Sequence, residues 1–249
     1  MTYCVGMKLD HGLIFMSDTR TNAGIDNIST FTKMHQWSTA GERVITILSA
    51  GNLATTQAVV SVLDERTKAP AERDPSILEV PTMFRVAELV GEVLSTTIAR
   101  HAGEGPTAEA TFDATVIVGG QIAGMPPRLF LVYPEGNFIE ASPDTPFMQI
   151  GETKYGKPIL VRAFDPSMSD TEAVKLLLVS FDSTIKANLS VGAPLDVAWY
   201  ENDSFEVMTP RRIERDNPDW QALSTGWGDA LRKAFDSLPD PDLDALPPR

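Results

Sequence analysis

The residue that follows the initiator methionine, Thr2, is the first position in this 249-residue chain at which chemistry is expected. Threonine is small enough that removal of Met1 is expected, which leaves a hydroxyl and a free amine on neighbouring atoms. A threonine hydroxyl is a weak nucleophile until a base activates it, and a terminal amine with a pKa of about 8 can be that base. Many chains also begin Met-Thr without any such chemistry, so the elements around Thr2 must decide between the two interpretations.

The other residue types that commonly form catalytic or metal sites do not combine into a pattern. His11, His35 and His101 fall in an expected turn, strand and helix end, and they show neither the order of a Ser-His-Asp triad nor metal-ligand spacing. The single cysteine, Cys4, shares a strand face with Thr2, where it is either a functional thiol or a small apolar filler. We therefore expect no metal and no cofactor.

Composition excludes several classes of function. The chain has 21 basic and 34 acidic residues, a net charge of −13, so nucleic acid is not an expected partner, because phosphate binding relies on a basic surface. No apolar run approaches the length of a membrane span, and the N-terminus has no signal-peptide pattern. One cysteine rules out an intrachain disulfide and fits a reducing compartment, so a cytoplasmic location is expected.

The elements that must position Thr2 are short strands. Residues 2–51 show strand-like alternation interrupted by turn residues, and two amphipathic helices follow. Strands are expected again over residues 112–118, 128–133 and 138–141, followed by two further helices. The second of these begins with the capping box Ser169–Glu172. Two last strands are expected over residues 196–200 and 205–208.

Runs of strands that alternate with pairs of helices predict a fold of the α+β class. Two antiparallel sheets packed face to face, with a helix pair on each outer face, give a four-layer αββα sandwich. We assign this domain to residues 1–210. Residues 211–249 are expected to form a C-terminal helix and a tail rich in Pro and Asp, packed either on the domain or on a neighbouring subunit.

Four motifs in the first 60 residues resemble the proteasome β-subunit superfamily of N-terminal-nucleophile hydrolases. They are Thr2, Ser17-Asp18 at the end of a strand, Lys33, and Ser49-Ala50-Gly51 before a helix. The segments 2–6, 17–24 and 33–35 look more specifically like the Anbu family, the ancestral-β-subunit proteins of bacteria. The αββα sandwich is also the fold of that superfamily.

The resemblance implies a role for each of these residues. Thr2 Oγ would attack a peptide or amide carbonyl, with its own amine as base. Lys33 would lower the pKa of both groups, Asp18 would hold Lys33, and the Gly51 N–H would stabilise the oxyanion. The pocket-shaping positions would be Thr21, Phe31 and Ser49. The resemblance also implies stacked rings or an open spiral of identical subunits; it identifies no partner ATPase.

The chain departs from the pattern of active proteasome subunits in three places. Lys33 lies one residue closer to the nucleophile, and Gly151-Glu152-Thr153 stands where a Gly-Ser-Gly segment supplies an auxiliary serine. The usual Asp-x-x-Ser-Gly segment has no clean counterpart; residues 188–192, after the fourth helix, are the nearest, and Ser190 is the expected contributor. Three functions therefore stay open: a threonine peptidase or amidase, a narrow amidase for a γ-glutamyl or isopeptide bond, and an assembly module without catalysis. Asp18 and Lys33 taken alone could also be an ordinary surface ion pair.

Overall fold

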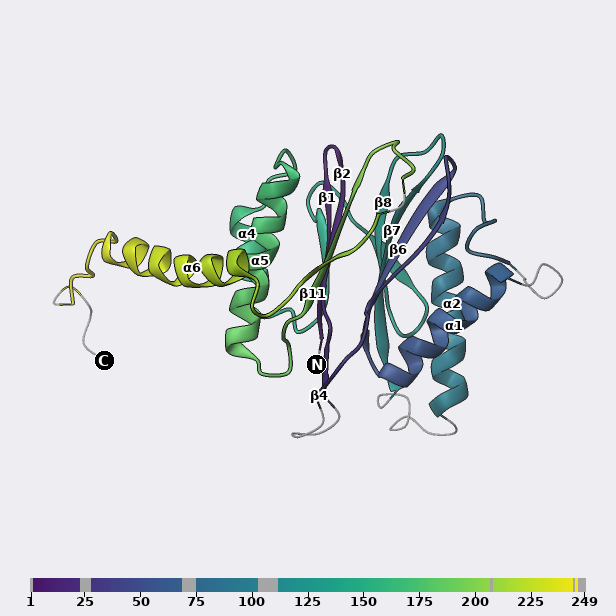
Figure 1. Ribbon diagram of the computed structural model, residues 1–249, viewed down its shortest axis with the longest axis horizontal. Helices are drawn as coiled ribbons and strands as arrows, with labels where there is room; N and C mark the ends of the chain where they lie inside the picture. The colour runs from purple at the N-terminus through teal and green to yellow at the C-terminus, as the bar shows by residue number, and fades with distance from the viewer. Residues whose placement is uncertain are drawn as a thin grey trace.

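The chain folds into four layers, two sheets face to face between two layers of helices (Figure 1). The structure is a computed structural model that describes residues 2–22, 28–68, 75–102, 112–206, 208–243 and 245. The predicted αββα sandwich is therefore confirmed.

The first sheet has the strand order β10-β1-β2-β11-β12, and every neighbouring pair is antiparallel. Its strands are β1 (Tyr3–Leu9), β2 (Gly12–Asp18), β10 (Phe147–Gly151), β11 (Leu195–Glu201) and β12 (Arg211–Ile213). The strand β1 lies in its interior, so Thr2 precedes a strand that has a neighbour on both sides. Since β12 pairs with β11, residues 211–213 belong to this sheet.

The second sheet has the order β5-β6-β7-β8-β9 and is also antiparallel throughout. Its strands are β5 (Met34–Thr39), β6 (Arg43–Gly51), β7 (Ala114–Ile122), β8 (Arg128–Val132) and β9 (Phe138–Glu140). A small hairpin, β3 (Arg20–Asn22) with β4 (Ile28–Thr30), leads the chain from the first sheet to the second.

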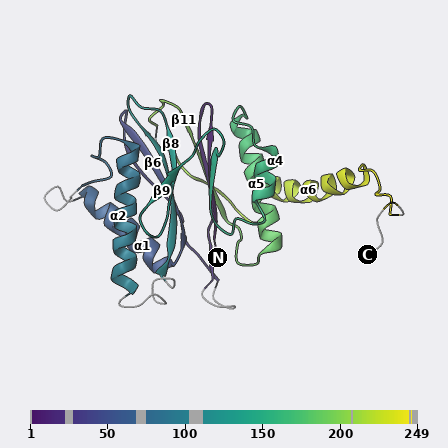
Figure 2. The same ribbon diagram turned by 180° about the vertical axis from the view of Figure 1, so that it is seen from behind.

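Two helices cover the outer face of each sheet, as Figures 1 and 2 show from opposite sides. The helices α1 (Leu53–Lys68) and α2 (Met83–Ala102) pack on the second sheet, and α4 (Lys157–Ala163) and α5 (Asp170–Ala187) pack on the first. The predicted capping box is present at the start of α5, where Ser169 and Glu172 exchange hydrogen bonds. The predicted apolar stripe of α2 is buried at Val86, Leu89 and Val93.

Three layers of buried apolar side chains hold the sandwich together. One lies between α1, α2 and the second sheet, one lies between α4, α5 and the first sheet, and the third fills the space between the two sheets. Successive side chains of β1 point alternately into two of these layers. Tyr3 and Val5 face the helices, whereas Cys4 faces the other sheet.

Two predicted details of the strands differ from the structure. The edge strand β10 was not predicted, because Phe147–Gly151 is short and follows a run rich in Pro and Asp. The strand expected over residues 205–208 does not form at Phe205, Glu206 or Met208, and Val207 lies outside the described residues. Phe205 has a φ of +46°, which a strand does not permit, and β12 takes the place beside β11.

The helix α6 (Pro218–Asp236) points away from the body of the molecule (Figure 1). It is anchored near its start, where Trp220 is buried against the first sheet's helix layer and the Ser224 carbonyl accepts a hydrogen bond from Lys186 at 3.3 Å. Across the described residues, no helix is both long enough and apolar enough to span a membrane.

Two helical glycines test the packing of α2. A Cβ on Gly91 would lie 2.1 Å from the Gly136 carbonyl oxygen in the turn before β9, whereas a Cβ on Gly228 in α6 would approach nothing closer than 4.0 Å. We expect Gly91→Ala to lower the free energy of unfolding by about 1–3 kcal/mol, because the helix or the turn must move. Gly228→Ala should leave it unchanged or raise it by up to about 1 kcal/mol through helix propensity. Urea denaturation followed by circular dichroism checks both, and an equal midpoint for Gly91→Ala and wild type would contradict the packing.

Candidate active site

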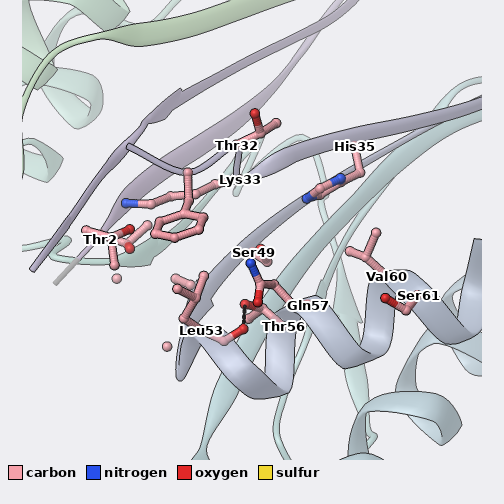
Figure 3. Close-up of a pocket in the computed structure, with 15 residues that line it drawn as sticks. Thr2, Thr32, Lys33, His35, Ser49, Leu53, Thr56, Gln57, Val60 and Ser61 are labelled. Atoms are coloured by element: carbon pink, nitrogen blue, oxygen red, sulfur yellow. Dashed lines mark hydrogen bonds between the residues drawn. The ribbon is translucent and has the colours of Figure 1, made fainter. Parts of the chain in front are cut away.

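A cavity of about 920 Å³ lies beside Thr2 and is lined mainly by the segment that enters β5, the end of β6 and one side of α1. Six of the eight predicted site residues line it: Thr2, Thr21, Phe31, Lys33, Ser49 and Gly51. Asp18 lies behind Lys33, and Ser190 is not one of the lining residues. The cavity is also lined by residues that were not predicted, among them Thr32, His35, Leu53, Thr56, Gln57, Val60, Ser61 and Gly151 (Figure 3).

Thr2 is held by the backbone that follows β10. Its carbonyl oxygen accepts a hydrogen bond from the Glu152 N–H at 2.7 Å. Gly151, with a φ of +80°, packs so closely that a Cβ there would lie 1.9 Å from the same carbonyl oxygen. Only glycine permits both the conformation and the contact, so the corner at residue 151 fixes the position of the nucleophile's backbone.

Asp18 and Lys33 form a buried ion pair. Lys33 Nζ lies 2.7 Å from Asp18 Oδ1; the Lys33 side chain is 6% exposed and the Asp18 side chain 0%. Asp18 also accepts hydrogen bonds from the Tyr3 N–H at 3.0 Å and the Gly192 N–H at 3.4 Å. The pair is therefore not a solvent-exposed surface pair.

The electrostatics of the pair follow from that burial. Loss of solvent raises the pKa of Asp18, and the Lys33 ammonium and two backbone N–H groups act in the opposite direction. Lys33 Nζ donates a second hydrogen bond to the Arg20 carbonyl at 2.7 Å. A lysine ammonium has three N–H donors, and its end lies next to Thr2 (Figure 3). The site thus places a fixed positive charge beside the threonine.

Gly51 ends β6 at the wall of the cavity. The Ser49 N–H donates to the Lys33 carbonyl at 3.0 Å, and the ladder between β5 and β6 ends at Leu48. Backbone N–H groups two residues apart on a strand point the same way, so the Gly51 N–H also points to the β5 side. It lies beyond Leu48, the last residue of β6 that pairs with β5. Gly51 has a φ of +117°, and a Cβ would lie 2.4 Å from the Asp113 carbonyl oxygen. A backbone donor therefore faces the cavity at a position that only glycine can occupy.

Ser190 lies in the loop between α5 and β11, and this loop contacts the site through other residues. The Ser190 N–H donates to Asn188 Oδ1 at 2.9 Å. Asn188 Nδ2 in turn donates to Glu152 Oε2 at 2.9 Å, beside Thr2. Gly192 reaches Asp18 from the same loop. The role assigned to Ser190 stays a prediction, and the residues of this loop that reach the site are Asn188 and Gly192.

Two further candidate residues, Cys4 and His11, do not line the cavity. Cys4 is fully buried, its thiol donates weakly to the Ser49 carbonyl at 3.7 Å, and burial raises its pKa. It is packed as a small apolar side chain. His11 pairs with Asp170 at 2.8 Å, and neither residue lines the cavity. Within the part of the chain that the structure describes, no group of three or more His, Cys, Asp or Glu could hold a metal ion.

Two of the residues missed by the sequence reasoning, Gln57 and Ser61, lie on α1 outside the predicted apolar stripe. The prediction for α1 used the stripe that includes Val59 and Leu63, which are buried in the core. Gln57 and Ser61 are exposed on α1 and face the cavity. His35 carried one signal, since it shares the strand parity of Lys33.

Removal of Lys33 tests the buried pair. Lys33→Met leaves the Asp18 carboxylate without its counter-ion, and we expect the free energy of unfolding at neutral pH to fall by about 3–5 kcal/mol. The loss should depend on pH. Lys33 lowers the pKa of Asp18, so its removal raises the folded-state pKa further above the unfolded value of about 4. The folded variant then binds the proton more tightly than the unfolded chain, and its stability falls as the pH rises through that window.

The measurement is chemical denaturation of both proteins between about pH 4 and 8. The difference in the free energy of unfolding between wild type and Lys33→Met should be largest at neutral pH and should become smaller toward acid pH. The double variant Lys33→Met/Asp18→Asn is the control, because it has no carboxyl group there to titrate and should remove the pH dependence of this difference. Parallel curves for wild type and the single variant would show that the pair is not buried as described.

Comparison with known proteins identifies the family. The family profile described as proteasome subunit matches residues 2–200. A search of the curated proteins found no match. Among solved structures, Anbu (ancestral beta-subunit) from Yersinia bercovieri is 46% identical, with a TM-score of 0.89, covering 97% of this chain and 99% of that one. Anbu from Hyphomicrobium sp. strain MC1 is 48% identical, with a TM-score of 0.87, covering 97% and 100%.

A third structure, described as the helical assembly of the Anbu complex from Pseudomonas aeruginosa, is 44% identical, with a TM-score of 0.90, and the match covers 98% of this chain and 100% of that one. The resemblance inferred from the motifs around Thr2, Asp18 and Lys33 is therefore confirmed at the level of the family. The chain belongs to the proteasome-subunit family and, within it, to the Anbu proteins.

Proposed function

We propose that this protein is a threonine hydrolase that cleaves a peptide or amide bond inside a homo-oligomer. The observation that carries the proposal is the juxtaposition of Thr2 and Lys33 on one cavity, with Lys33 held by a fully buried carboxylate. A lysine that served only stability would not need to line the same cavity as the threonine. A cavity of this size also suits a peptide-sized ligand.

The reaction begins once Met1 has been removed and the Thr2 amine is free. The amine takes the proton of the Thr2 hydroxyl, and Oγ attacks the carbonyl carbon of the substrate. The C–N bond breaks, the leaving amine receives that proton, and an ester to Thr2 remains. Water then adds to the ester carbonyl, the amine accepts a proton from it, and the acid is released as Thr2 recovers its hydroxyl.

Lys33 and Gly51 supply the electrostatics of both steps. The positive charge of Lys33 stabilises the developing alkoxide of Thr2 and lowers the pKa of the neighbouring amine, so that a larger fraction of it is unprotonated at neutral pH. The Gly51 N–H would donate to the oxyanion of the tetrahedral intermediate, and a single donor of this kind is worth about 3–4 kcal/mol. Asp18 does not touch the substrate; it positions Lys33.

An assembly module without catalysis is the second candidate. One observation favours it: no serine from residues 151–153 or from position 190 lines the cavity, so an auxiliary hydroxyl near the Thr2 amine is not supplied by those segments. A narrow amidase is the intermediate case, in which one γ-glutamyl or isopeptide bond is cleaved and general peptides are not.

Covalent labelling separates these functions. A peptide epoxyketone reacts with an N-terminal threonine through both its hydroxyl and its amine, so we expect one adduct per subunit at Thr2 in protein that has lost Met1. Intact-protein mass spectrometry gives the occupancy, and peptide mapping gives the site. Thr2→Ala should abolish labelling and hydrolysis, whereas Thr2→Ser keeps a hydroxyl nucleophile and should retain part of both.

The control is the Lys33→Arg variant, which keeps the charge but not the compact ammonium, and should label at least tenfold more slowly. Protein that keeps Met1 in cells, or processed protein that never labels at Thr2, would favour the assembly module. Labelling without cleavage of a broad peptide panel, together with cleavage of a γ-glutamyl amide, would favour the narrow amidase.

Self-association is supported by α6. Leu231 and Phe235 lie one turn apart on this helix and are 49% and 75% exposed, and the helix stands away from its own domain (Figure 1). Most of the stability of a helix in a protein comes from packing its apolar face, so a helix with an exposed apolar stripe gains by packing on another copy. The assembly named for the relative from Pseudomonas aeruginosa agrees with this role.

The double variant Leu231→Asp/Phe235→Asp tests that role. We expect it to shift the sedimentation coefficient toward smaller species while the spectrum of the folded domain stays unchanged. Lys233→Asp is the matched control, because it changes the net charge of α6 by the same amount and lies between the two apolar positions on the other side of the helix. An unchanged sedimentation profile for the double variant would remove α6 from the interface.

A further inference from the structure

Glu152 is a partly buried carboxylate next to Thr2 to which the hydrolytic scheme assigns no role. It follows the corner at Gly151. In the antiparallel register of β1 with β10, Tyr3 pairs with Gly151, so the next residue, Glu152, comes opposite Thr2. The Glu152 N–H donates to the Thr2 carbonyl at 2.7 Å. The carboxylate therefore belongs to the residue whose backbone holds the nucleophile.

Asn188 keeps this carboxylate in one place. Its Nδ2 donates to Glu152 Oε2 at 2.9 Å, and its Oδ1 accepts from the Ser190 N–H at 2.9 Å. The backbone of Asn188 is fixed as well, because its N–H donates to the Thr184 carbonyl at the end of α5 at 2.8 Å. Both ends of the Asn188 amide are thus engaged, and Glu152 is not a freely solvated side chain.

The same loop is tied to the ion pair, so the hydrogen bonds form a closed circuit around the start of β1. From Thr2 the circuit passes through Glu152 to the loop of residues 188–192. The Gly192 N–H of that loop reaches Asp18 Oδ2 at 3.4 Å, and Asp18 Oδ1 accepts from the Tyr3 N–H at 3.0 Å. Glu152 is therefore fixed relative both to Thr2 and to the buried pair.

Glu152 differs from the other charged residues around Thr2 in having no charged partner. Asp18 and Lys33 neutralise each other, and the side chain of Arg20 lies along Gly192. Among the residues that the structure describes, none forms an ion pair with Glu152, and none donates a hydrogen bond to its second oxygen, Oε1. The charged residues on the described segments that meet at Thr2 are Asp18, Arg20, Lys33, Asp113, Glu152 and Lys154, of which Asp113 and Lys154 are exposed.

A partly buried carboxylate loses hydration, and a nearby cation offsets that loss. Removal of Met1 creates such a cation, since a terminal amine has a pKa of about 8 and is mostly protonated at neutral pH. We propose that the Glu152 carboxylate, held by Asn188, is the counter-charge of the ammonium that forms on Thr2. The inference rests on the proposed function for the removal of Met1, and it adds a positioning residue to the same site.

This arrangement matches the charges that develop in the reaction. When the proton moves from Thr2 Oγ to the amine, the oxygen becomes negative and the nitrogen becomes positive. Lys33 then faces the negative oxygen, and Glu152 stabilises the positive nitrogen, because opposite charges attract over several ångströms in a partly desolvated site. Glu152 acts through the amine and does not touch the substrate. Lys33 does not take over as its partner, because the ammonium is engaged by Asp18 and by the Arg20 carbonyl.

The two charges shift the pKa of the Thr2 amine in opposite directions. An adjacent anion favours the ammonium and raises the pKa, whereas the Lys33 cation lowers it. Glu152→Gln keeps the length of the side chain and an oxygen that can accept from Asn188, but it removes the charge. In this variant the pKa of the amine should therefore fall.

The experiment measures that pKa without catalysis. The full chain is prepared by cleavage of a fusion partner directly before Thr2, so that every molecule carries the free amine. It is treated briefly with acetic anhydride at a series of pH values, and acetylation of Thr2 is measured by peptide mass spectrometry. Only the neutral amine reacts. We expect the midpoint for Glu152→Gln to lie at least about 0.5 pH unit below that of wild type, which makes acetylation about threefold faster at pH values below both midpoints.

Glu201→Gln is the matched control, because it makes the same change at the far end of the first sheet. Along β11, Leu195 pairs with Asp18 near the site, whereas Glu201 pairs with Gly12 at the other end. Its midpoint should equal that of wild type. Asn188→Ala releases Glu152 and should give a midpoint between those of wild type and Glu152→Gln. Equal midpoints for Glu152→Gln and wild type would overturn the inference, and a wild-type midpoint for Asn188→Ala would remove Asn188 from it.

Epoxyketone labelling then separates this inference from the proposed function. Glu152→Gln should label faster than wild type at low pH, where more of its amine is neutral. It should label more slowly at high pH, where the developing ammonium lacks its counter-charge, so the two pH profiles should cross. Profiles that coincide would exclude Glu152 from the reaction. A shifted acetylation midpoint in a protein whose Thr2 never labels would sustain the counter-charge and reject hydrolysis, whereas labelling with equal midpoints would do the reverse.

Discussion

The buried ion pair between Asp18 and Lys33 is the interaction on which the site depends. It joins the end of β2 in the first sheet to the residue before β5 in the second sheet, at the open end of the sandwich. Removing two charges from water costs several kcal/mol per ion unless hydrogen bonds satisfy them. Asp18 meets that requirement with three N–H donors, and Lys33 with a carboxylate and a carbonyl. The ammonium beside Thr2 is therefore fixed before any substrate arrives, which is the condition for electrostatic stabilisation without reorganisation.

The second constraint is the close approach of backbone segments on both sides of Thr2. Gly151 contacts the Thr2 carbonyl, and Gly51 packs on Asp113, each with a positive φ and no room for a Cβ. These contacts set the distance between the nucleophile's backbone and the N–H that faces the cavity. A side chain at either glycine would move the Thr2 backbone away from the Gly51 N–H. The distance between these two groups is therefore set by backbone contacts and not by side-chain packing.

The sequence predicts the parts of this arrangement that depend on local pattern. Alternation along β1, the stripe on α2 and the capping box of α5 were enough to derive the αββα order, and the motifs around Thr2, Asp18 and Lys33 pointed to residues that the fold brings together. Contacts between distant segments carry no such pattern. The strand β10 is too short to be recognised, and the link from Asn188 to Glu152 joins residues 36 positions apart. Gln57 and Ser61 were missed because amphipathic analysis reports the buried side of a helix, whereas a cavity is lined by the other side.

The reacting groups and the exposed polar side chains of α1 line different parts of the cavity. Asp18 ends β2 of the first sheet and accepts a hydrogen bond from Tyr3, the residue after Thr2, and Lys33 is paired with Asp18, so the nucleophile's strand and its cation share one anchor. Gln57 and Ser61 belong to α1, whose inner face is fixed in the core through Val59 and Leu63. Because the outer face of α1 carries no core packing, its side chains can be replaced without displacing the helix or the ion pair. Gln57 and Ser61, the exposed residues that line the cavity from α1, are therefore positions at which substitution is little constrained by stability, whereas Val60 lines the cavity and also packs on the core.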